Sequence, residues 1–131
     1  MVTRIEISRT VLDAIQAHAA ADAPREACGL LFGNDSRIDA SVPAANVADD
    51  PQRHFEVDPA ILLQASRAAR AGGPTIAGYY HSHPSGCAEP SETDQRMAAP
   101  DGRLWLIVAG DTVTAWRNGK NGFEAVTLAI V

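Results

Sequence analysis

The chain has 131 residues, 46% of them hydrophobic and 21% charged, an ordinary composition for one globular domain over residues 1–131 that buries its own core. Its formal net charge is −5, with 11 basic against 16 acidic residues, which argues against nucleic acid as a partner because phosphate binding relies on clustered Lys and Arg. We find no signal-peptide pattern, no apolar run long enough to cross a bilayer and only two cysteines, so we expect a cytoplasmic protein without a membrane partner or a disulfide framework.

Strand and helix patterns alternate in the first half of the chain. Strands are predicted at residues 4–7, 28–32, 37–42 and 55–57. Helices are predicted to begin after the N-cap residues Ser8 and Asp58. The apolar faces that we expect these helices to bury are Val11, Leu12, Ile15 and Ala19 in the first, and Ile61, Leu62, Ala65, Ala68 and Ala69 in the second.

A polar loop separates the third and fourth of these strands. We interpret Asn46 there as a turn-forming residue, with a place lining the site as the alternative. We interpret His54, next to the strand that follows, as a solvated loop histidine, with a position near the site as the alternative.

The second half is predicted to contain a strand, a helix and three closing strands. The apolar and aromatic run 75–80 predicts a buried strand, and Pro90 followed by Ser91 predicts the start of a helix that ends near Ala99. The closing strands are predicted at 104–108, 112–117 and 123–130. Strands mostly connected by hairpins, with helices packed on the sheet, indicate an α+β fold whose mixed sheet is mostly antiparallel.

One stretch, residues 81–94, concentrates groups that bind metal ions. His81 and His83 leave the end of the predicted strand on the same face, roughly 6.6 to 6.8 Å apart at the backbone, a span that two converging imidazole rings can close onto one ion. Asp94 lies in the first turn of the following helix and faces back towards them. Ser91 and Asp94 also form a capping-box pattern, which alone indicates a helix cap, but the conjunction with the two histidines favours a metal site.

Three protein ligands leave a fourth tetrahedral position open, as in catalytic zinc sites. Hydrolysis also needs a base, and Glu26 directly precedes an apolar run. A charged side chain at this place is costly unless it is exposed to solvent or has a function. The alternative for Glu26 is the solvated end of a helix–strand connection. Two histidines and one carboxylate also make the facial triad of non-haem iron enzymes, an alternative that metal analysis discriminates.

These residues together resemble the JAMM motif of the MPN/Mov34 family of zinc metallopeptidases. The resemblance rests on Glu26 with Gly29, on the run 81–84, and on Pro90, Ser91 and Asp94. It implies that His81, His83 and Asp94 bind Zn²⁺, that Glu26 holds and deprotonates the zinc-bound water, and that Ser91 steadies the tetrahedral intermediate. It also implies an MPN fold, which is cytidine-deaminase-like.

The resemblance further implies a bacterial-type, stand-alone peptidase or isopeptidase that acts on the C-terminal tail of a small ubiquitin-like sulfur-carrier protein. Such a tail could add along an exposed strand edge. The chain lacks the long insertions of ubiquitin-chain-specific members, which argues against a eukaryotic-type deubiquitinase. The alternative function is a non-catalytic MPN scaffold, although a scaffold has no physical need for a costly ionisable cluster.

Cys87 lies inside the motif loop and could in principle become a fourth ligand that closes the site. Gly86 and Pro90 predict a loop that bulges away, so we expect Cys87 not to coordinate the metal.

Overall fold

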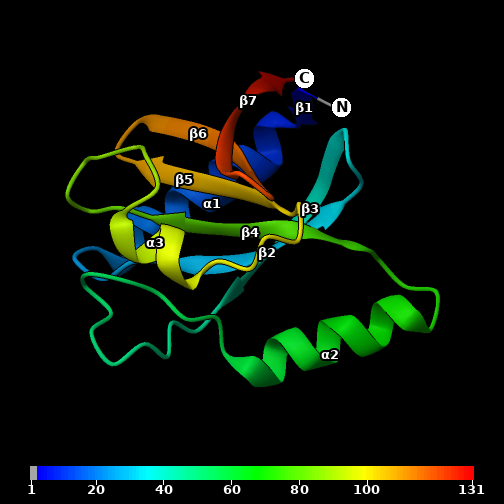
Figure 1. Ribbon diagram of the computed structural model, residues 1–131, viewed down its shortest axis with the longest axis horizontal. Helices are drawn as coiled ribbons and strands as arrows, with labels where there is room; N and C mark the ends of the chain where they lie inside the picture. Colours follow the sequence, from blue (N-terminus) through cyan, green and yellow to red (C-terminus); the bar gives the residue numbers. More distant parts are fainter. Residues whose placement is uncertain (1–2) are drawn as a thin grey trace.

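The computed structural model describes residues 3–131, in which seven strands and three helices follow one another (Figure 1). In chain order they are β1 (Arg4–Ile7), α1 (Arg9–Asp22), β2 (Cys28–Gly33), β3 (Arg37–Ala44), α2 (Pro59–Arg70), β4 (Ile76–Ser82), α3 (Glu92–Met97), β5 (Leu104–Ala109), β6 (Thr112–Gly119) and β7 (Gly122–Ile130). The predicted α+β class is confirmed. No helix among the described residues is long and apolar enough to span a membrane.

The strands form one closed barrel in the order β1-β3-β2-β4-β5-β6-β7. Four neighbouring pairs are antiparallel, and three pairs, β1–β3, β1–β7 and β4–β5, are parallel, so the mixed and mostly antiparallel sheet is confirmed. The sequence pattern does not predict that the sheet closes into a barrel. Closure depends on the short strand β1, which pairs with β3 on one side and β7 on the other.

Successive side chains on a strand point to opposite faces, so one face of β4 and β5 packs in the hydrophobic core and the other carries His81. Tyr80 of β4 and Leu106 of β5 belong to the hydrophobic core, together with Leu12 and Ile15 of α1. His81 lies on the opposite face of β4, where its ring contacts Trp105 of β5. The core thus holds β4 rigidly from one side and leaves the histidine face available for a site.

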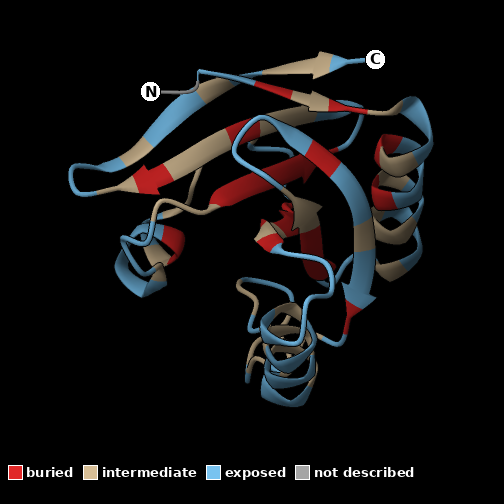
Figure 2. Cartoon of the chain, turned by 90° about the vertical axis from the view of Figure 1, so that its right-hand side faces the viewer, coloured by how far each residue is buried: buried red, intermediate tan, exposed pale blue. Residues whose placement is uncertain are grey.

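The two predicted helix starts are confirmed, but the two helices are covered differently. Ser8 caps α1 by accepting a hydrogen bond from the Val11 amide at 3.2 Å, and Asp58 caps α2 by accepting one from the Ala60 amide at 3.0 Å. The expectation that α2 buries its apolar face is wrong, because no residue of α2 is buried (Figure 2). The spacing identified the side of this helix that faces the protein, since Ile61, Leu62, Ala65 and Ala69 are half-buried, but its contacts, which include β4, do not bury this face completely.

The predicted strand at 55–57 is also wrong. Only an isolated bridge joins Asn46 to Val57, and the rest of the segment is irregular. The reason is that a side chain replaces the strand ladder: Asn46 Oδ1 accepts hydrogen bonds from the amides of Ala48 and Glu56 at 3.0 and 3.1 Å. We call residues 45–58 the 45–58 loop.

The close approach of β4 and β5 generates a prediction about Gly78. Gly78 pairs with Leu104 in parallel register, and a Cβ atom at this position would overlap the Leu104 carbonyl oxygen. We expect Gly78→Ala to lower the free energy of unfolding by about 2 kcal/mol or more, because two paired backbones must move apart. Chemical denaturation measures this change.

Gly119→Ala is the matched control. Gly119 is also a strand glycine, its φ is not positive, and a Cβ atom there would meet nothing within 4 Å. Equal destabilisation by the two substitutions would contradict the packing explanation.

Candidate metal centre

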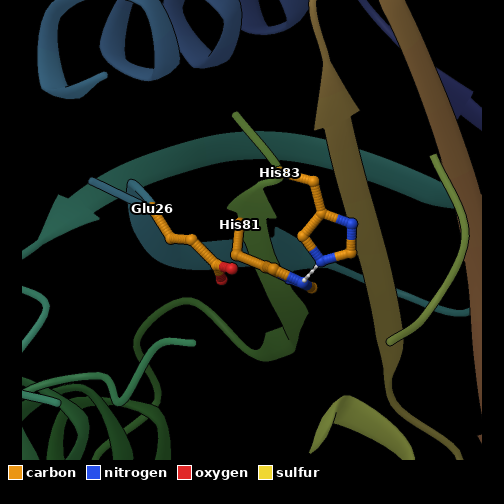
Figure 3. A group of neighbouring side chains, drawn as sticks. All are labelled: Glu26, His81 and His83. Atoms are coloured by element: carbon orange, nitrogen blue, oxygen red, sulfur yellow. Dashed lines mark hydrogen bonds between the residues drawn. The ribbon is translucent and has the colours of Figure 1, made fainter. Parts of the chain in front are cut away.

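Four segments bring the predicted residues together at one end of the barrel: the stretch before β2, strand β4, the loop after β4, and α3, which carries Asp94. β4 carries His81, and His83 follows directly after it, held by a hydrogen bond from its amide to the Val108 carbonyl of β5 at 2.8 Å. β2 pairs antiparallel with β4 so that Cys28 lies opposite His81, which places the preceding Glu26 beside the histidines. Figure 3 shows the Glu26 carboxylate pointing toward the His81 ring.

Three potential ligand atoms converge on one point. His81 Nε2 lies 2.9 Å from His83 Nε2, and both nitrogens lie 3.1 Å from Asp94 Oδ2. Ligands bound at zinc's usual distances in a tetrahedron stand about 3.3 Å apart, so this triangle needs only slight widening to hold the ion. All three residues are buried, and burying two imidazoles and a carboxylate this close without a cation is costly. The donor set fits zinc.

Asp94 serves as both a helix cap and a candidate ligand. Its Oδ2 accepts a hydrogen bond from the Ser91 amide at 2.9 Å, and its own amide donates to Ser91 Oγ at 3.0 Å. The capping box, which was the alternative interpretation of Ser91 and Asp94, is therefore present. Its hydrogen bonds orient the Asp94 carboxylate toward the two histidines.

Glu26 lies beside the three candidate ligands. With His81 and His83 it forms a group whose ligand atoms lie within 4.8 Å of one another and could also hold a metal ion. Its side chain is buried, and Oε1 has no hydrogen-bond partner among residues 3–131. Burial raises the pKa of Glu26 to about 7, a value suited to a group that accepts and returns a proton near neutral pH.

The three inner residues differ in their electrostatics. Burial lowers the pKa of His81. For His83 burial acts in the same direction, but its hydrogen bonds to Asp94 and the Cys87 carbonyl, with the charges of Asp94 and Glu26, raise its pKa. Burial alone would raise the pKa of Asp94, but hydrogen bonds to the two histidines hold it far below its usual range. Asp94 is therefore ionised at neutral pH, as a metal ligand must be.

Several residues that hold Glu26, His81 and His83 in place were not identified from the sequence. Ser82 Oγ accepts a hydrogen bond from the Ala27 amide at 2.8 Å and so ties the Glu26 segment to β4. His83 Nδ1 contacts the Cys87 carbonyl oxygen at 2.6 Å. Phe55 stacks on the His81 ring with centroids 4.2 Å apart. Only the position of Ser82 inside the motif could have pointed to a role.

Asn46 and His54 lie outside the group of ligand atoms. The Asn46 side chain donates to the Glu26 carbonyl oxygen at 2.9 Å, so it acts on the backbone behind Glu26 and forms turns as expected. His54 Nε2 lies 2.8 Å from Asp49 Oδ1, and the imidazole hydrogen bond, the largest effect, lowers the pKa of Asp49.

A cavity of about 730 Å³ opens next to the metal centre. Its walls come from the 45–58 loop, the start of α2, α3 with the segment after it, and the outer face of β4 and β5. Most of the lining is apolar or aromatic, and Asp94 is part of it. The large apolar and aromatic side chains of the lining are Val47, Phe55, Leu62, Tyr79, Met97 and Trp105.

Known proteins are similar to this chain in sequence. Residues 8–119 match the family model described as prokaryotic homologs of the JAB domain. The chain is 33% identical over 135 residues to a desampylase of Haloferax volcanii, covering 98% of this chain and 97% of that protein. It is 32% identical over 108 residues to the CysO-cysteine peptidase of Mycobacterium tuberculosis, covering 80% and 73%.

Solved structures agree with this match. A protein of Desulfitobacterium hafniense has a TM-score of 0.85 at 29% identity, covering 97% of this chain and 92% of that chain. The JAMM structure described as a metalloprotease-like zinc site in the proteasome and signalosome has a TM-score of 0.62 at 23% identity, covering 98% and 99%, and shares the fold.

A barrel that carries two histidines and a carboxylate beside a buried glutamate has the site expected of the JAMM/MPN class of proteins. Within this class, the chain belongs to the family of prokaryotic homologs of the JAB domain.

We expect the purified protein to hold about one zinc per chain. His81→Ala and Asp94→Ala remove one of three candidate ligands and should abolish zinc retention, whereas Glu26→Gln should keep the metal because the triangle of His81, His83 and Asp94 remains. Elemental analysis after gel filtration measures both effects. His54→Ala is the matched control, since it removes a nearby histidine outside the ligand group. Iron in place of zinc, or zinc loss in Glu26→Gln, would contradict this assignment.

Cys87 gives a separate prediction. Its side chain is exposed, and its backbone carbonyl, which no substitution removes, is the group that contacts His83. Cys87→Ser should therefore leave zinc content and turnover within about twofold of the parent, whereas a cysteine ligand would give a large loss. Parallel zinc analysis and peptidase assays check this, and loss of zinc in the variant would indicate a closed, four-ligand site.

Proposed function

We propose that this single domain, residues 1–131, is a zinc-dependent metallopeptidase or isopeptidase. The observation that carries the proposal is a buried glutamate, with one oxygen unpartnered among the described residues, beside three converging ligand atoms. A purely structural metal site has no use for such a group, and a protein without metal has no reason to bury it.

We assign the metal to His81, His83 and Asp94. When bound, zinc supplies a Lewis acid that polarises a carbonyl group and lowers the pKa of water to about 7. Three protein ligands leave room for substrate at the fourth position. The hydrogen bond from His83 Nδ1–H to the Cys87 carbonyl would leave Nε2 as the ligand atom of that ring.

Glu26 is assigned as the general base and then the general acid. Its carboxylate accepts a proton from the attacking water and returns it to the departing amine, which a pKa near 7 permits in both directions. The Asn46 and Pro51 hydrogen bonds to the carbonyl and amide of Glu26 limit its movement during this exchange.

Ser91 is assigned as the residue that stabilises the oxyanion. Its oxygen already accepts the Asp94 amide at 3.0 Å, so the hydroxyl proton remains free to be donated to the carbonyl oxygen of the substrate. Because Ser91 begins the helix that carries Asp94, one helix terminus would hold both a metal ligand and this donor.

We propose the C-terminal tail of a small ubiquitin-like or sulfur-carrier protein as substrate. The two curated relatives are named a desampylase and a CysO-cysteine peptidase, and the apolar cavity that includes Asp94 is a suitable place for an extended tail. The expected addition of the tail along an exposed strand edge stays a prediction. β4 itself is paired with β2 on one side and β5 on the other, so the tail would not add to this strand, and we place it in the cavity.

The alternative of a non-catalytic scaffold is disfavoured by the same buried cluster, since a surface for partners does not require it. The cytoplasmic location and the absence of nucleic-acid and membrane partners stay predictions.

The substrate is tested with ubiquitin-like carriers that continue past a Gly-Gly sequence, mixed with the zinc-loaded protein. Mass spectrometry should detect carriers that end at the second glycine, because small residues let the scissile carbonyl approach the metal. Glu26→Gln should be slower by about 100-fold or more. If no carrier is trimmed while an unrelated peptide or a ubiquitin chain is cleaved in a Glu26-dependent way, the substrate is wrong and the chemistry stands.

A further inference from the structure

The two histidines of the metal centre are held in place by different means. His83 is oriented by the contact of its Nδ1 with the Cys87 carbonyl at 2.6 Å. His81 is completely buried, yet its Nδ1 has no hydrogen-bond partner among the described residues. Metal-binding histidines are usually oriented by a hydrogen bond from the second ring nitrogen, so some other interaction must set the His81 ring.

Two aromatic rings provide that interaction. Phe55 lies against the face of the His81 ring, with centroids 4.2 Å apart and planes 19° from parallel. The Trp105 ring meets His81 edge-on, at 5.4 Å and 87°. Trp105 belongs to the barrel, but Phe55 comes from the 45–58 loop, which has no strand ladder to hold it.

Hydrogen bonds nevertheless fix the loop backbone on both sides of Phe55. Asn46 Nδ2 donates to the carbonyl of His54, the residue before Phe55, at 3.1 Å, and Asn46 Oδ1 accepts the amide of Glu56, the residue after it, at 3.1 Å. The same side chain donates to the Glu26 carbonyl at 2.9 Å. One asparagine thus sets the distance between the candidate base and the ring that covers the candidate ligand.

We propose that Phe55 is a positioning residue that holds the zinc ligand His81 in its binding orientation by stacking. Phe55 replaces the hydrogen bond that His81 lacks, and without it the imidazole can turn away from the point where the ligand atoms meet. Phe55 also lines the cavity assigned to the substrate tail, so a bound chain touches the ring that supports the metal ligand. The inference rests on the proposed zinc site.

The variants separate stacking from general packing. Phe55→Leu keeps an apolar side chain and removes the flat face, and we expect zinc affinity to fall by about 10-fold to 100-fold, as when other supporting contacts of metal ligands are lost. Phe55→Tyr keeps the face and should stay within about twofold of the parent, because Phe55 is only partly buried and lines an open cavity.

Phe123→Leu is the matched control. Phe123 is also partly buried and packs on Trp105, with centroids 4.9 Å apart. Phe55 packs on the same Trp105 ring. The substitution loosens the same aromatic cluster without removing the ring that covers His81, so zinc affinity should change little.

Zinc affinity is measured by competition with a chelator, and thermal unfolding of each metal-free variant reports whether it folds. Nuclear magnetic resonance of the zinc-loaded parent gives a second readout that needs no variant: His81 ring protons should be shielded by Phe55 and show nuclear Overhauser contacts to it. Equal affinity of Phe55→Leu and the parent, an equal loss in Phe123→Leu, or absence of these contacts would overturn the inference. A parent protein that binds no zinc would instead overturn the proposed function.

Discussion

The convergence of two imidazole nitrogens and one carboxylate oxygen within 3.1 Å of one another is the constraint on which the rest of this structure depends. Three buried polar groups at such distances are costly unless a cation joins them. The fold therefore has to hold them together against that cost. It does so with a strand that is paired on both sides and a helix whose cap is also a candidate ligand.

Strand register is the main device that meets this constraint. The antiparallel pairing of Cys28 with His81 sets where Glu26 stands, and a shift of one residue would turn His81 into the core, the place now occupied by Tyr80. The hydrogen bond from the Ala27 amide to Ser82 Oγ secures this register at the site itself. Buried packing on the α1 side of β4 thus stabilises the geometry of the polar side.

The irregular 45–58 loop adds contacts to the candidate site that the barrel alone does not provide. The 45–58 loop covers His81, holds the backbone of Glu26 and forms one wall of the cavity that reaches Asp94. The exposed helix α2 follows directly from this loop and borders the same cavity through Leu62. One segment therefore contributes both to the candidate metal centre and to the cavity proposed for the substrate.

The sequence by itself determined the features that depend on neighbouring residues. These are the capped helix starts at Ser8 and Asp58, the strand and histidine pair of residues 75–83, and the capping box at Ser91 and Asp94. Motif spacing was enough to name the candidate ligands and the candidate base because each motif is short, and the structure brings these residues together. The tertiary structure alone decided closure of the barrel through β1, the incomplete burial of the apolar face of α2 and the loss of the strand expected at 55–57. It also decided that Phe55 and Asn46 support His81 and Glu26, since these contacts join residues 20 or more positions apart, which no local pattern records.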